Sequence, residues 1–337
     1  MSPADRKCTD QMRRAVFQGV NTIEIESLDR GSIGEGDVRL RVDACGVCGS
    51  DVTTFFTGHY VAVGQVMGHE ITGTVCEVGK DVQGLAEGDR VMVMPMRSCG
   101  QCWYCRRGEP HLCGRGNECS LAYGRPGGFA DEIVLENPRV GRDVIHVGAD
   151  VSQDDAVWAE PLAVAMHGLA RGELAAGSEV LVIGAGPLGL CVIAAARAAG
   201  ATPHCVEPRP ARRHAALQAG AVTAVAPGEP VPPVEAVYDT SGVARAIHQA
   251  IPHLRPGGGV VLLGLGDIPL EVESLPVRMR GSFAYQDADF AHAVSLINSG
   301  AVRLGDLVTH RFALEHIAEA ITAAATAEDA VKVTVNP

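Results

Sequence analysis

The segment 179–200 places a short apolar run, a glycine-rich turn and an alanine-rich run in direct succession. "EVLVIGAG" (179–186) predicts a buried strand, and "PLGLCVIAAARAAG" (187–200) predicts a helix that Gly200 would cap. Further β-rich runs, separated by helical or loop segments, follow at 203–207, 236–242, 258–265 and 280–285. Because parallel strands need crossover connections, this alternation predicts an α/β fold with a doubly wound parallel sheet.

The chain before about residue 155 has a different pattern. It is rich in glycine, with short apolar runs and frequent turns, as in "ITGTVCEVGKDVQGLAEGDRVMV" (71–93). This pattern predicts an antiparallel β domain of barrel type. The 337 residues suffice for about two domains with separate cores. After about residue 290 we expect one helix and a final strand, and we expect the proline-rich 226–235 to be a surface loop.

Charge and hydropathy exclude several classes of function. The chain has 28 basic and 40 acidic residues and a net charge of −12, without a basic run, which argues against nucleic-acid or anionic-membrane surfaces. The apolar stretches are too short to span a bilayer, for which about 18–20 residues are needed. The first residues, "MSPADRKCTDQMRR", contain no apolar signal-peptide core, so we expect a cytoplasmic protein.

The glycine-rich turn "GAGPLG" (Gly184–Gly189) fits G-x-G-x-x-G between a strand and a helix. In that context the pattern is typical of a dinucleotide site, where the glycines let the pyrophosphate approach the helix N-terminus. Glu207 ends the next strand and can accept hydrogen bonds from both ribose hydroxyls of NAD. The alternatives are NADP, which the nearby Arg209, Arg212 and Arg213 would suit, and a glycine turn without a ligand.

Four cysteines are arranged as C-x2-C-x2-C-x7-C in "CGQCWYCRRGEPHLC" (99–113). One loop can fold four such thiolates around a tetrahedral Zn²⁺, and Gly100 and Gly108 supply the necessary turns. A site closed by four protein ligands would be structural rather than catalytic. The alternatives are an iron–sulfur cluster and free or disulfide-bonded cysteines. We expect no regular element in this loop, and we expect His111 to be a surface residue. The proposed ligands are Cys99, Cys102, Cys105 and Cys113.

A second metal site is suggested by scattered residues. Cys48, the pair His69–Glu70 and Glu160 offer one thiolate, one imidazole and two carboxylates. Mixed ligands from separate segments usually leave a coordination position for water or substrate. Each of these residues alone is weak evidence. The other cysteines have no partners by spacing, and we expect free, mostly buried thiols at Cys8, Cys76, Cys119, Cys191 and Cys205.

Taken in order, these motifs resemble the zinc-dependent medium-chain dehydrogenase/reductase family. The resemblance covers essentially the whole chain and rests on "GVCGSD", "GHE", "GDRV", "CGQCWYCRRGEPHLC", "GGFADEIV", "AEPLAVAMHGL", "GAGPLG", "DTSG" and "THRF". It is closest to the branch of sorbitol, threonine and butanediol dehydrogenases, because Glu160 lies in a similar "EPL" motif. The resemblance implies a GroES-like β-barrel-type catalytic domain (1–158 and 290–337) and a Rossmann domain (159–289).

The resemblance also implies roles for individual residues. Cys48, His69 and Glu70 would bind a catalytic zinc, with Glu160 as direct ligand or exchangeable partner, and Cys45 would not be a ligand. The four cysteines of 99–113 would bind a structural zinc. Glu207 and Arg212 would bind the adenosine ribose. The remaining cofactor contacts would come from Gly184, Gly186, Pro187, Leu188, Gly189, Gly264, Leu265, Phe283, Ala284 and Tyr285.

The implied reaction is oxidation of a secondary alcohol of a polyol, cyclitol or amino alcohol. Zinc would lower the pKa of the alcohol, Ser50 would accept its proton, and NAD would take the hydride. Thr53 stands where the family commonly has the histidine that ends this proton relay, and threonine is no base near neutral pH. His59 is nearby in sequence and could replace that histidine, but the simpler interpretation is that His59 is an ordinary loop residue. Ala284 replaces an arginine common in polyol dehydrogenases, which disfavours plain sorbitol.

Two alternatives stay open. One is an NADP-dependent aldehyde or ketone reductase of the same family, and the other is a zinc-binding scaffold that has lost its chemistry. Relatives of this kind are homodimers or homotetramers, so we expect one of these states, with a small-molecule alcohol or ketone as the substrate.

Overall fold

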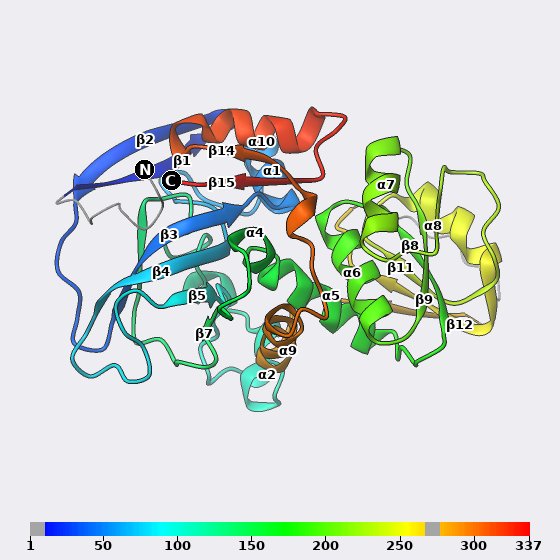
Figure 1. Ribbon diagram of the computed structural model, residues 1–337, viewed down its shortest axis with the longest axis horizontal. Coiled ribbons are helices and arrows are strands. Elements are labelled where there is room, and N and C mark those ends of the chain that lie inside the picture. Colours follow the sequence, from blue (N-terminus) through cyan, green and yellow to red (C-terminus); the bar gives the residue numbers. More distant parts are fainter. Residues whose placement is uncertain (1–10, 267–276) are drawn as a thin grey trace.

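The computed structural model describes residues 11–266 and 277–337. Cys8, expected to be a free thiol, lies outside them. Two lobes lie side by side, each built on one sheet (Figure 1). The first and last described strands, β1 and β15, lie in the same lobe (Figure 1). The helices are α1 (Gly49–Thr57), α2 (Trp103–Arg106), α3 (Gly116–Cys119), α4 (Gln153–Ala156), α5 (Ala159–Arg171), α6 (Pro187–Ala198), α7 (Pro210–Gln218), α8 (Ala244–Ala250), α9 (Asp287–Asn298) and α10 (Ile317–Thr326).

One lobe contains a six-stranded sheet in which every pairing is parallel. Alternate residues face opposite sides: Val180 and Val182 pack toward α5 and α6, whereas Leu181 packs toward α8. This confirms the predicted doubly wound sheet. Its strands, in spatial order, are β10 (Thr223–Val225), β9 (Thr202–Val206), β8 (Glu179–Ile183), β11 (Val234–Asp239), β12 (Leu254–Leu262) and β13 (Arg278–Gly281).

The other lobe contains a seven-stranded sheet, antiparallel except where β14 meets β15. A two-stranded ribbon of β1 (Gln11–Gly19) and β2 (Thr22–Asp29) lies beside it. The strands of the larger sheet are β14 (Val308–Phe312), β15 (Lys332–Val335), β3 (Val38–Gly46), β4 (Glu70–Val78), β5 (Arg90–Val93), β7 (Val144–His146) and β6 (Glu132–Leu135), which pairs with β3.

The segment after residue 290 differs from the prediction of one helix and one strand. Two helices are found there, because most of α9 lies after residue 290 and α10 follows it, and both β14 and β15 are strands. β14 is short and, among the described strands, pairs only with β15 at the edge of the sheet. Its five residues are too few to give a clear strand pattern in the sequence. β15 pairs with the end of β3, with Thr334 opposite Gly46, so the last strand belongs to the lobe of the seven-stranded sheet.

Helix α5 joins the two lobes. It follows the buried Trp158 and packs against α6 on one side and α9 on the other. Its buried residues belong to the same apolar cluster as Ala44 and Met92 of the seven-stranded sheet and Val182 of the six-stranded sheet. The second residue of α5 is Glu160, so this helix positions a carboxylate where the lobes meet.

The parallel sheet ends earlier than the sequence suggested. The strand predicted over 280–285 is β13, Arg278–Gly281, and Phe283–Tyr285 lie beyond it. Ala284 has a φ of 52°, in the left-handed region, which ends the extended conformation. The proline-rich 226–235 is irregular except at its end, where β11 begins at Val234. Among the described residues, no helix is long and apolar enough to cross a membrane.

Candidate active site

The four cysteines of 99–113 come together in one loop. The Sγ atom of Cys102 lies 3.4 Å from that of Cys105 and 3.8 Å from that of Cys113, which lies 3.5 Å from that of Cys99. The four Sγ atoms are all within 4.8 Å of one another. Thiolates at 2.3 Å from a tetrahedral Zn²⁺ are about 3.8 Å apart, so this set fits a closed zinc site.

Local conformation brings these cysteines together. Gly100 and Gly108 have φ values of 71° and 78°, which fits the predicted need for glycine. Contrary to the expectation of no regular element, the short α2 begins directly after Cys102 and contains Cys105. The backbone N–H of Cys105 is the largest influence on Cys102, whose pKa falls to about 6. A thiol of this kind readily loses the proton that metal binding requires.

A second cluster contains Cys48, His69 and Glu70, whose ligand atoms also lie within 4.8 Å of one another. Cys48 caps the start of α1, and the Asp51 carboxylate accepts a hydrogen bond from its backbone N–H at 2.9 Å. Asp51 also accepts from the N–H of Gly68 at 3.4 Å. One buried carboxylate therefore fixes the backbone on both sides of the cluster, and the thiolate, imidazole and carboxylate fit a mixed zinc site.

The Glu70 carboxylate forms an ion pair with Lys332 of β15, and both side chains are at most 1% exposed. Although burial alone would lower it, the pKa of Lys332 is raised by the Glu70 charge. Its Nζ also lies 5.2 Å from the ring centroid of Trp158. A Cβ on Gly46 would overlap the Glu70 carboxylate, so only glycine leaves room for this pair.

Glu160 is buried beside this cluster but is not one of its three close members. Burial, reinforced by the charge of Glu70, raises its pKa to about 7, against the charges of His69 and Lys332. Tyr285 lies next to it: burial and then the Glu160 charge raise the pKa of this phenol. The side chain of Tyr285 is buried whereas that of Phe283 is 57% exposed, because the turn at Ala284 separates them.

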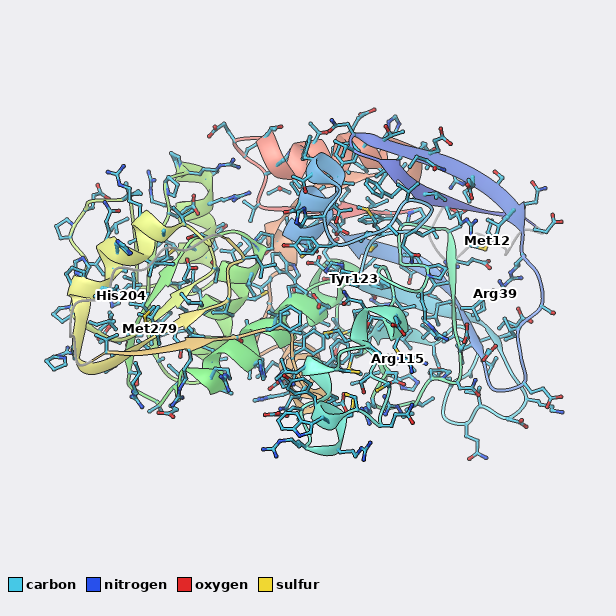
Figure 2. All side chains as sticks on the ribbon, turned by 180° about the vertical axis from the view of Figure 1, so that it is seen from behind. Met12, Arg39, Arg115, Tyr123, His204 and Met279 are labelled. Atoms are coloured by element: carbon cyan, nitrogen blue, oxygen red, sulfur yellow. The ribbon has the colours of Figure 1, made fainter. Side chains whose placement is uncertain are left out.

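Two predicted proton-transfer residues lie on α1. The Ser50 side chain lies beside the phenol of Tyr123. The ring of Tyr123 lies 5.7 Å from that of His69, and Figure 2 shows this residue where the two lobes meet. The Thr53 hydroxyl donates to the carbonyl of Gly49 at 3.0 Å. His59 is exposed and its ring contacts that of Tyr60.

The glycine-rich turn fits a dinucleotide. Gly184 has a φ of 91°, and a Cβ on Gly189 would overlap the carbonyl of Gly184. Gly186 caps α6 without a side chain and Pro187 is its first residue, so the first N–H groups of α6 meet no capping side chain. Leu188 lies in the first turn of the same helix.

Glu207 and Arg212 lie beside this turn. Glu207 is buried and accepts hydrogen bonds at 2.8 Å from the N–H groups of Ala185 and Arg209. The Arg212 guanidinium donates to the carbonyl of Ala330 at 3.1 Å, in the other lobe. Gly264 packs tightly on Gly242, so that a Cβ on Gly264 would overlap the backbone N–H of Gly242. The side chain of the next residue, Leu265, is exposed.

The structure also reveals functional candidates that the sequence did not single out. Asp51 could have been found from its position three residues after Cys48, which is the spacing of a capping box. Tyr123 and Lys332 had no local signal, since only the tertiary fold brings them to the cluster. His111 is not simply a surface residue: its ring centroid lies 4.8 Å from that of His167, which is held by Asp289 at 2.9 Å.

The remaining thiols are unevenly buried. Cys191 and Cys205 are buried, as expected, whereas Cys76 and Cys119 are partly exposed, and none of the four forms a disulfide with another described cysteine. Cys45 is buried and is not a member of either cluster.

A doubly wound lobe with a dinucleotide turn, joined to a β lobe carrying two zinc-type clusters, defines a zinc-binding dehydrogenase. The sequence matches the alcohol dehydrogenase GroES-like domain over residues 34–144 and the zinc-binding dehydrogenase domain over residues 187–299. The chain belongs to the zinc-dependent medium-chain dehydrogenase/reductase family and is an oxidoreductase acting on CH–OH groups. The predicted fold class, a GroES-like domain with a Rossmann domain, is confirmed.

Relatives match over nearly the whole chain. L-Idonate 5-dehydrogenase of Vitis vinifera is 31% identical, covering 94% of this chain and 93% of its own. Sorbitol dehydrogenase of Bacillus subtilis (strain 168) is 30% identical, covering 92% of each. Among solved structures, a zinc-binding dehydrogenase of Sinorhizobium meliloti 1021 bound to NADP superposes with a TM-score of 0.88, at 28% identity over 98% of this chain and 100% of that one.

Proposed function

We propose that this dehydrogenase oxidises a secondary alcohol of a polyol, cyclitol or amino alcohol with NAD as the hydride acceptor. The observation that carries the proposal is the group of Cys48, His69, Glu70 and Glu160 where the two lobes meet, in which Cys48 is partly exposed and the other three are buried. The polyol and sugar-acid dehydrogenases among the relatives support this substrate class. When bound, zinc polarises the alcohol oxygen and the nicotinamide accepts the hydride.

The residues of the chain would then have distinct tasks. Cys48, His69 and Glu70 hold the metal, and Lys332 fixes the orientation of Glu70. Glu160, with a pKa of about 7, can be a carboxylate or a neutral acid near physiological pH, so it can act as a ligand or as an exchangeable partner. The burial of these groups excludes bulk water, which strengthens electrostatic interactions at the reacting atoms.

The proton would leave through Ser50, whose side chain lies beside Tyr123. Thr53 cannot serve as the terminal base, and its hydroxyl already donates a hydrogen bond to a backbone carbonyl. We therefore propose that the relay ends at solvent near Ser50 rather than at a side chain of α1. Phe283 and Tyr285 would border the nicotinamide, Phe283 from the exposed side of the turn.

The other assignments from the sequence are retained as proposals. The four cysteines of 99–113 would hold the structural zinc. The catalytic domain would comprise 1–158 and 290–337 and the Rossmann domain 159–289, which agrees with the sheets that contain β3 and β15 on one side and β8–β13 on the other. A cytoplasmic location and a dimeric or tetrameric state stay predictions.

A panel assay tests the proposal. Purified protein is mixed with NAD⁺ or NADP⁺ and with acyclic polyols, cyclitols, amino-cyclitols, threonine, butanediol and simple alcohols at mildly alkaline pH, and reduced nicotinamide is followed by absorbance. Turnover of one polyhydric or amino-alcohol class with NAD⁺ is expected. Turnover of simple primary alcohols only would contradict the substrate class, and silence across the panel would favour the scaffold alternative.

The second candidate is an NADP-dependent reductase, which the NADP-bound relative and the arginines after Glu207 favour. A carboxylate at the ribose would repel a 2′-phosphate, so Glu207→Gln should shift the ratio of kcat/KM from NAD toward NADP by about ten-fold or more. An unchanged ratio would show that Glu207 does not select the cofactor. Glu229→Gln, on a surface loop of the same lobe, is the control.

A further inference from the structure

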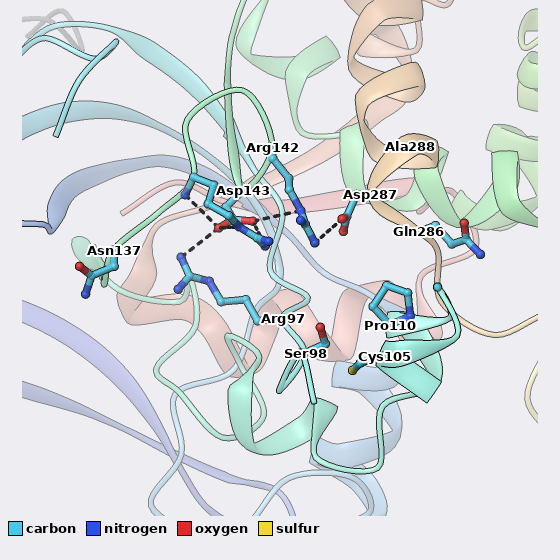
Figure 3. Close-up of a pocket in the computed structure, with 13 residues that line it drawn as sticks. Arg97, Ser98, Cys105, Pro110, Asn137, Arg142, Asp143, Gln286, Asp287 and Ala288 are labelled. Atoms are coloured by element: carbon cyan, nitrogen blue, oxygen red, sulfur yellow. Dashed lines mark hydrogen bonds and ion pairs between the residues drawn. The ribbon is translucent and has the colours of Figure 1, made fainter. Parts of the chain in front are cut away.

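A cavity of about 600 Å³ lies between the cysteine loop, the turn at 137–143 and the start of α9 (Figure 3). None of the residues proposed to bind the cofactor lines it. Its walls carry three arginines and two aspartates, with Ser98, Asn137 and Gln286 as neutral hydrogen-bonding groups. The charged residues are Arg97, Arg139, Arg142, Asp143 and Asp287.

One aspartate forms ion pairs with all three arginines of the cavity, most closely with Arg139. The Asp143 side chain is 3% exposed and receives three hydrogen bonds from Arg139, two from the guanidinium at 2.6 and 3.0 Å and one from the backbone N–H at 3.0 Å. This bidentate pair neutralises both charges. Arg97 and Arg142 lie 3.6 and 3.9 Å from the same carboxylate, and Arg142 also pairs with Asp287.

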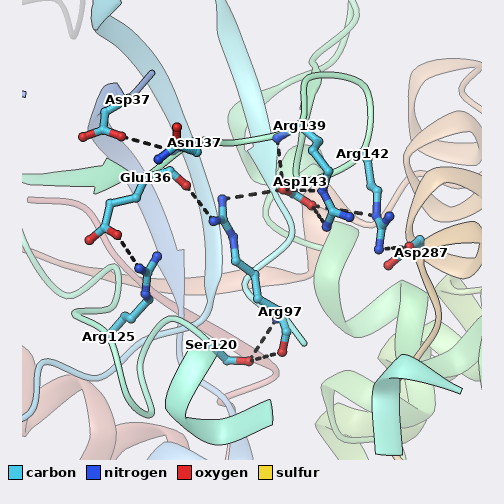
Figure 4. Close-up of polar contacts among 10 residues, drawn as sticks. All are labelled: Asp37, Arg97, Ser120, Arg125, Glu136, Asn137, Arg139, Arg142, Asp143 and Asp287. Carbon is cyan, nitrogen blue, oxygen red and sulfur yellow. Dashed lines mark hydrogen bonds and ion pairs between the residues drawn. The ribbon is translucent and has the colours of Figure 1, made fainter. Parts of the chain in front are cut away.

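The other two arginines have N–H groups without an acceptor in the part of the chain that the structure describes. Arg142 pairs with Asp287, but its buried Nε has no hydrogen-bond partner and lies 3.9 Å from Asp143. Arg97 donates to the carbonyl of Glu136 at 2.6 Å, whereas its other terminal nitrogen lies 3.6 Å from Asp143 (Figure 4). Both distances to Asp143 exceed those of a hydrogen bond.

The cavity walls carry three positive and two negative side chains, although the whole protein carries −12. Burial lowers the pKa of Arg97, and the charges of Arg125 and Arg139 lower it further against the attraction of Asp143. Guanidinium forks match the oxygens of phosphate and carboxylate groups better than they match chloride or water. Arg97 and Arg142 come from different segments, so their donors converge from two directions, which suits a tetrahedral anion.

We propose that this cavity binds a small molecule through a phosphate group, with Arg97 and Arg142 as its principal donors. A phosphate alone would fill little of 600 Å³, so the site has room for a phosphate ester whose remainder contacts Ser98, Asn137 and Gln286. Arg142 would then share its charge between the ligand and Asp287. The inference rests on these contacts and not on the substrate class of the dehydrogenase.

The test is calorimetric titration of the zinc-loaded protein at constant ionic strength, with NAD⁺ or NADP⁺ present in excess so that the pyrophosphate site at α6 is filled. The probes are inorganic phosphate, glucose 6-phosphate and, as the uncharged control, glucose. We expect saturable binding of both phosphates and none of glucose. Tighter binding of glucose 6-phosphate would indicate an ester as the ligand, and equal affinity would indicate free phosphate.

Variants locate the binding. Arg97→Gln and Arg142→Gln should each weaken phosphate binding by about ten- to hundred-fold, the value of a charge-assisted hydrogen bond. Arg125→Gln is the matched control, because it removes a nearby charge that pairs with Glu136 and does not line the cavity. Ala288→Trp fills the cavity from an exposed position of α9 without removing an ion pair, and should also abolish binding.

Two results would overturn the proposal. The first is a wild-type protein that shows no saturable phosphate binding up to about 10 mM, far above the concentration at which paired guanidinium groups hold phosphate. The second is an Arg125→Gln variant weakened as much as Arg142→Gln, or an Ala288→Trp variant that binds normally. Either would mean that the phosphate responds to general surface charge or to another site.

Discussion

The two metal-type clusters of this protein are assembled in opposite ways. The four cysteines of 99–113 lie within one partly exposed loop, and turns and a single helical turn bring their sulfur atoms together. Cys48, His69, Glu70 and Glu160 come from three segments spread over more than a hundred residues, and Lys332 reaches them from the last strand. A local site depends on its own loop, whereas the dispersed site depends on the packing of both lobes.

The difference also concerns charge. The cysteine loop can lose protons to solvent, because backbone N–H groups lower the pKa of Cys99 and Cys102. Glu70 of the dispersed cluster is buried, so its charge needs a partner inside the protein, and Lys332 supplies the positive one. The dispersed cluster should therefore be sensitive to substitutions far away in the sequence, and the local cluster only to its own members.

The largest effect is expected from the thiolate of the dispersed cluster. Cys48→Ala should lower turnover about 1000-fold or more, because a first ligand of the metal is lost, and should reduce bound zinc from two ions to one per chain. The measurements are steady-state kinetics and metal analysis. Cys45→Ala is the control, since this buried thiol lies outside the cluster. Full turnover in Cys48→Ala would refute the assignment of the catalytic metal.

Removing the buried cation should be nearly as severe. Lys332→Met leaves Glu70 as an unpaired buried charge and should lower the free energy of unfolding by about 3–5 kcal/mol. Chelators should also extract one zinc about 10- to 100-fold faster, because Glu70 is no longer oriented. Denaturant unfolding and metal-release kinetics measure both. Lys80→Met, which removes an exposed pair with Glu35, should change neither quantity, and equal behaviour of the two variants would remove the proposed role of Lys332.

A substitution in the cysteine loop should affect stability more than chemistry. Cys102→Ser should remove one zinc and lower the melting temperature by about 8 °C, while kcat of the folded protein changes by less than about three-fold. Calorimetry, metal analysis and kinetics test this. Cys119→Ser, a partly exposed thiol outside the cluster, serves as the control. A loss of kcat as large as that of Cys48→Ala would mean that the loop is part of the catalytic centre.

The smallest effect concerns the pH dependence of stability in the metal-free protein. The pKa of Glu160 is about 7 when folded, above its value of 4.5 when unfolded, so the folded state binds this proton more tightly. The resulting stabilisation is complete below about pH 4.5 and is lost as the pH rises through about 7. Between pH 5 and pH 8, wild type should lose about 2 kcal/mol more than Glu160→Gln, measured by urea unfolding. Equal losses would contradict the raised pKa.

Local sequence patterns predicted a large part of this protein correctly. The strand, glycine turn and helix of 179–200 form β8 and α6 as expected, and Gly200 follows the helix with a φ of 81°. The cysteine loop was predicted from spacing alone, because all its ligands lie within 15 residues. These features depend on dihedral preferences and on contacts between neighbours in the chain.

The errors of prediction concern segments whose structure depends on distant partners. β14 was missed, because a short strand needs β15 to form its hydrogen bonds. The strand predicted over 280–285 ends at Gly281, and the turn at Ala284 then separates Phe283 from Tyr285. His111 was expected at the surface, but its packing against His167 is a contact between the cysteine loop and α5.

By itself, the sequence determined the two kinds of lobe, the dinucleotide turn, the closed cysteine site and the set of candidate ligands for the open one, since each follows from the spacing of a few residues. Only the tertiary structure decided that Lys332 neutralises Glu70, that Tyr123 meets Ser50, and that three arginines share one cavity with two aspartates. The physical reason is that charges and hydrogen bonds act over a few ångströms in space. The chain brings such residues together only when its last strand pairs with β3 and its two lobes pack on α5.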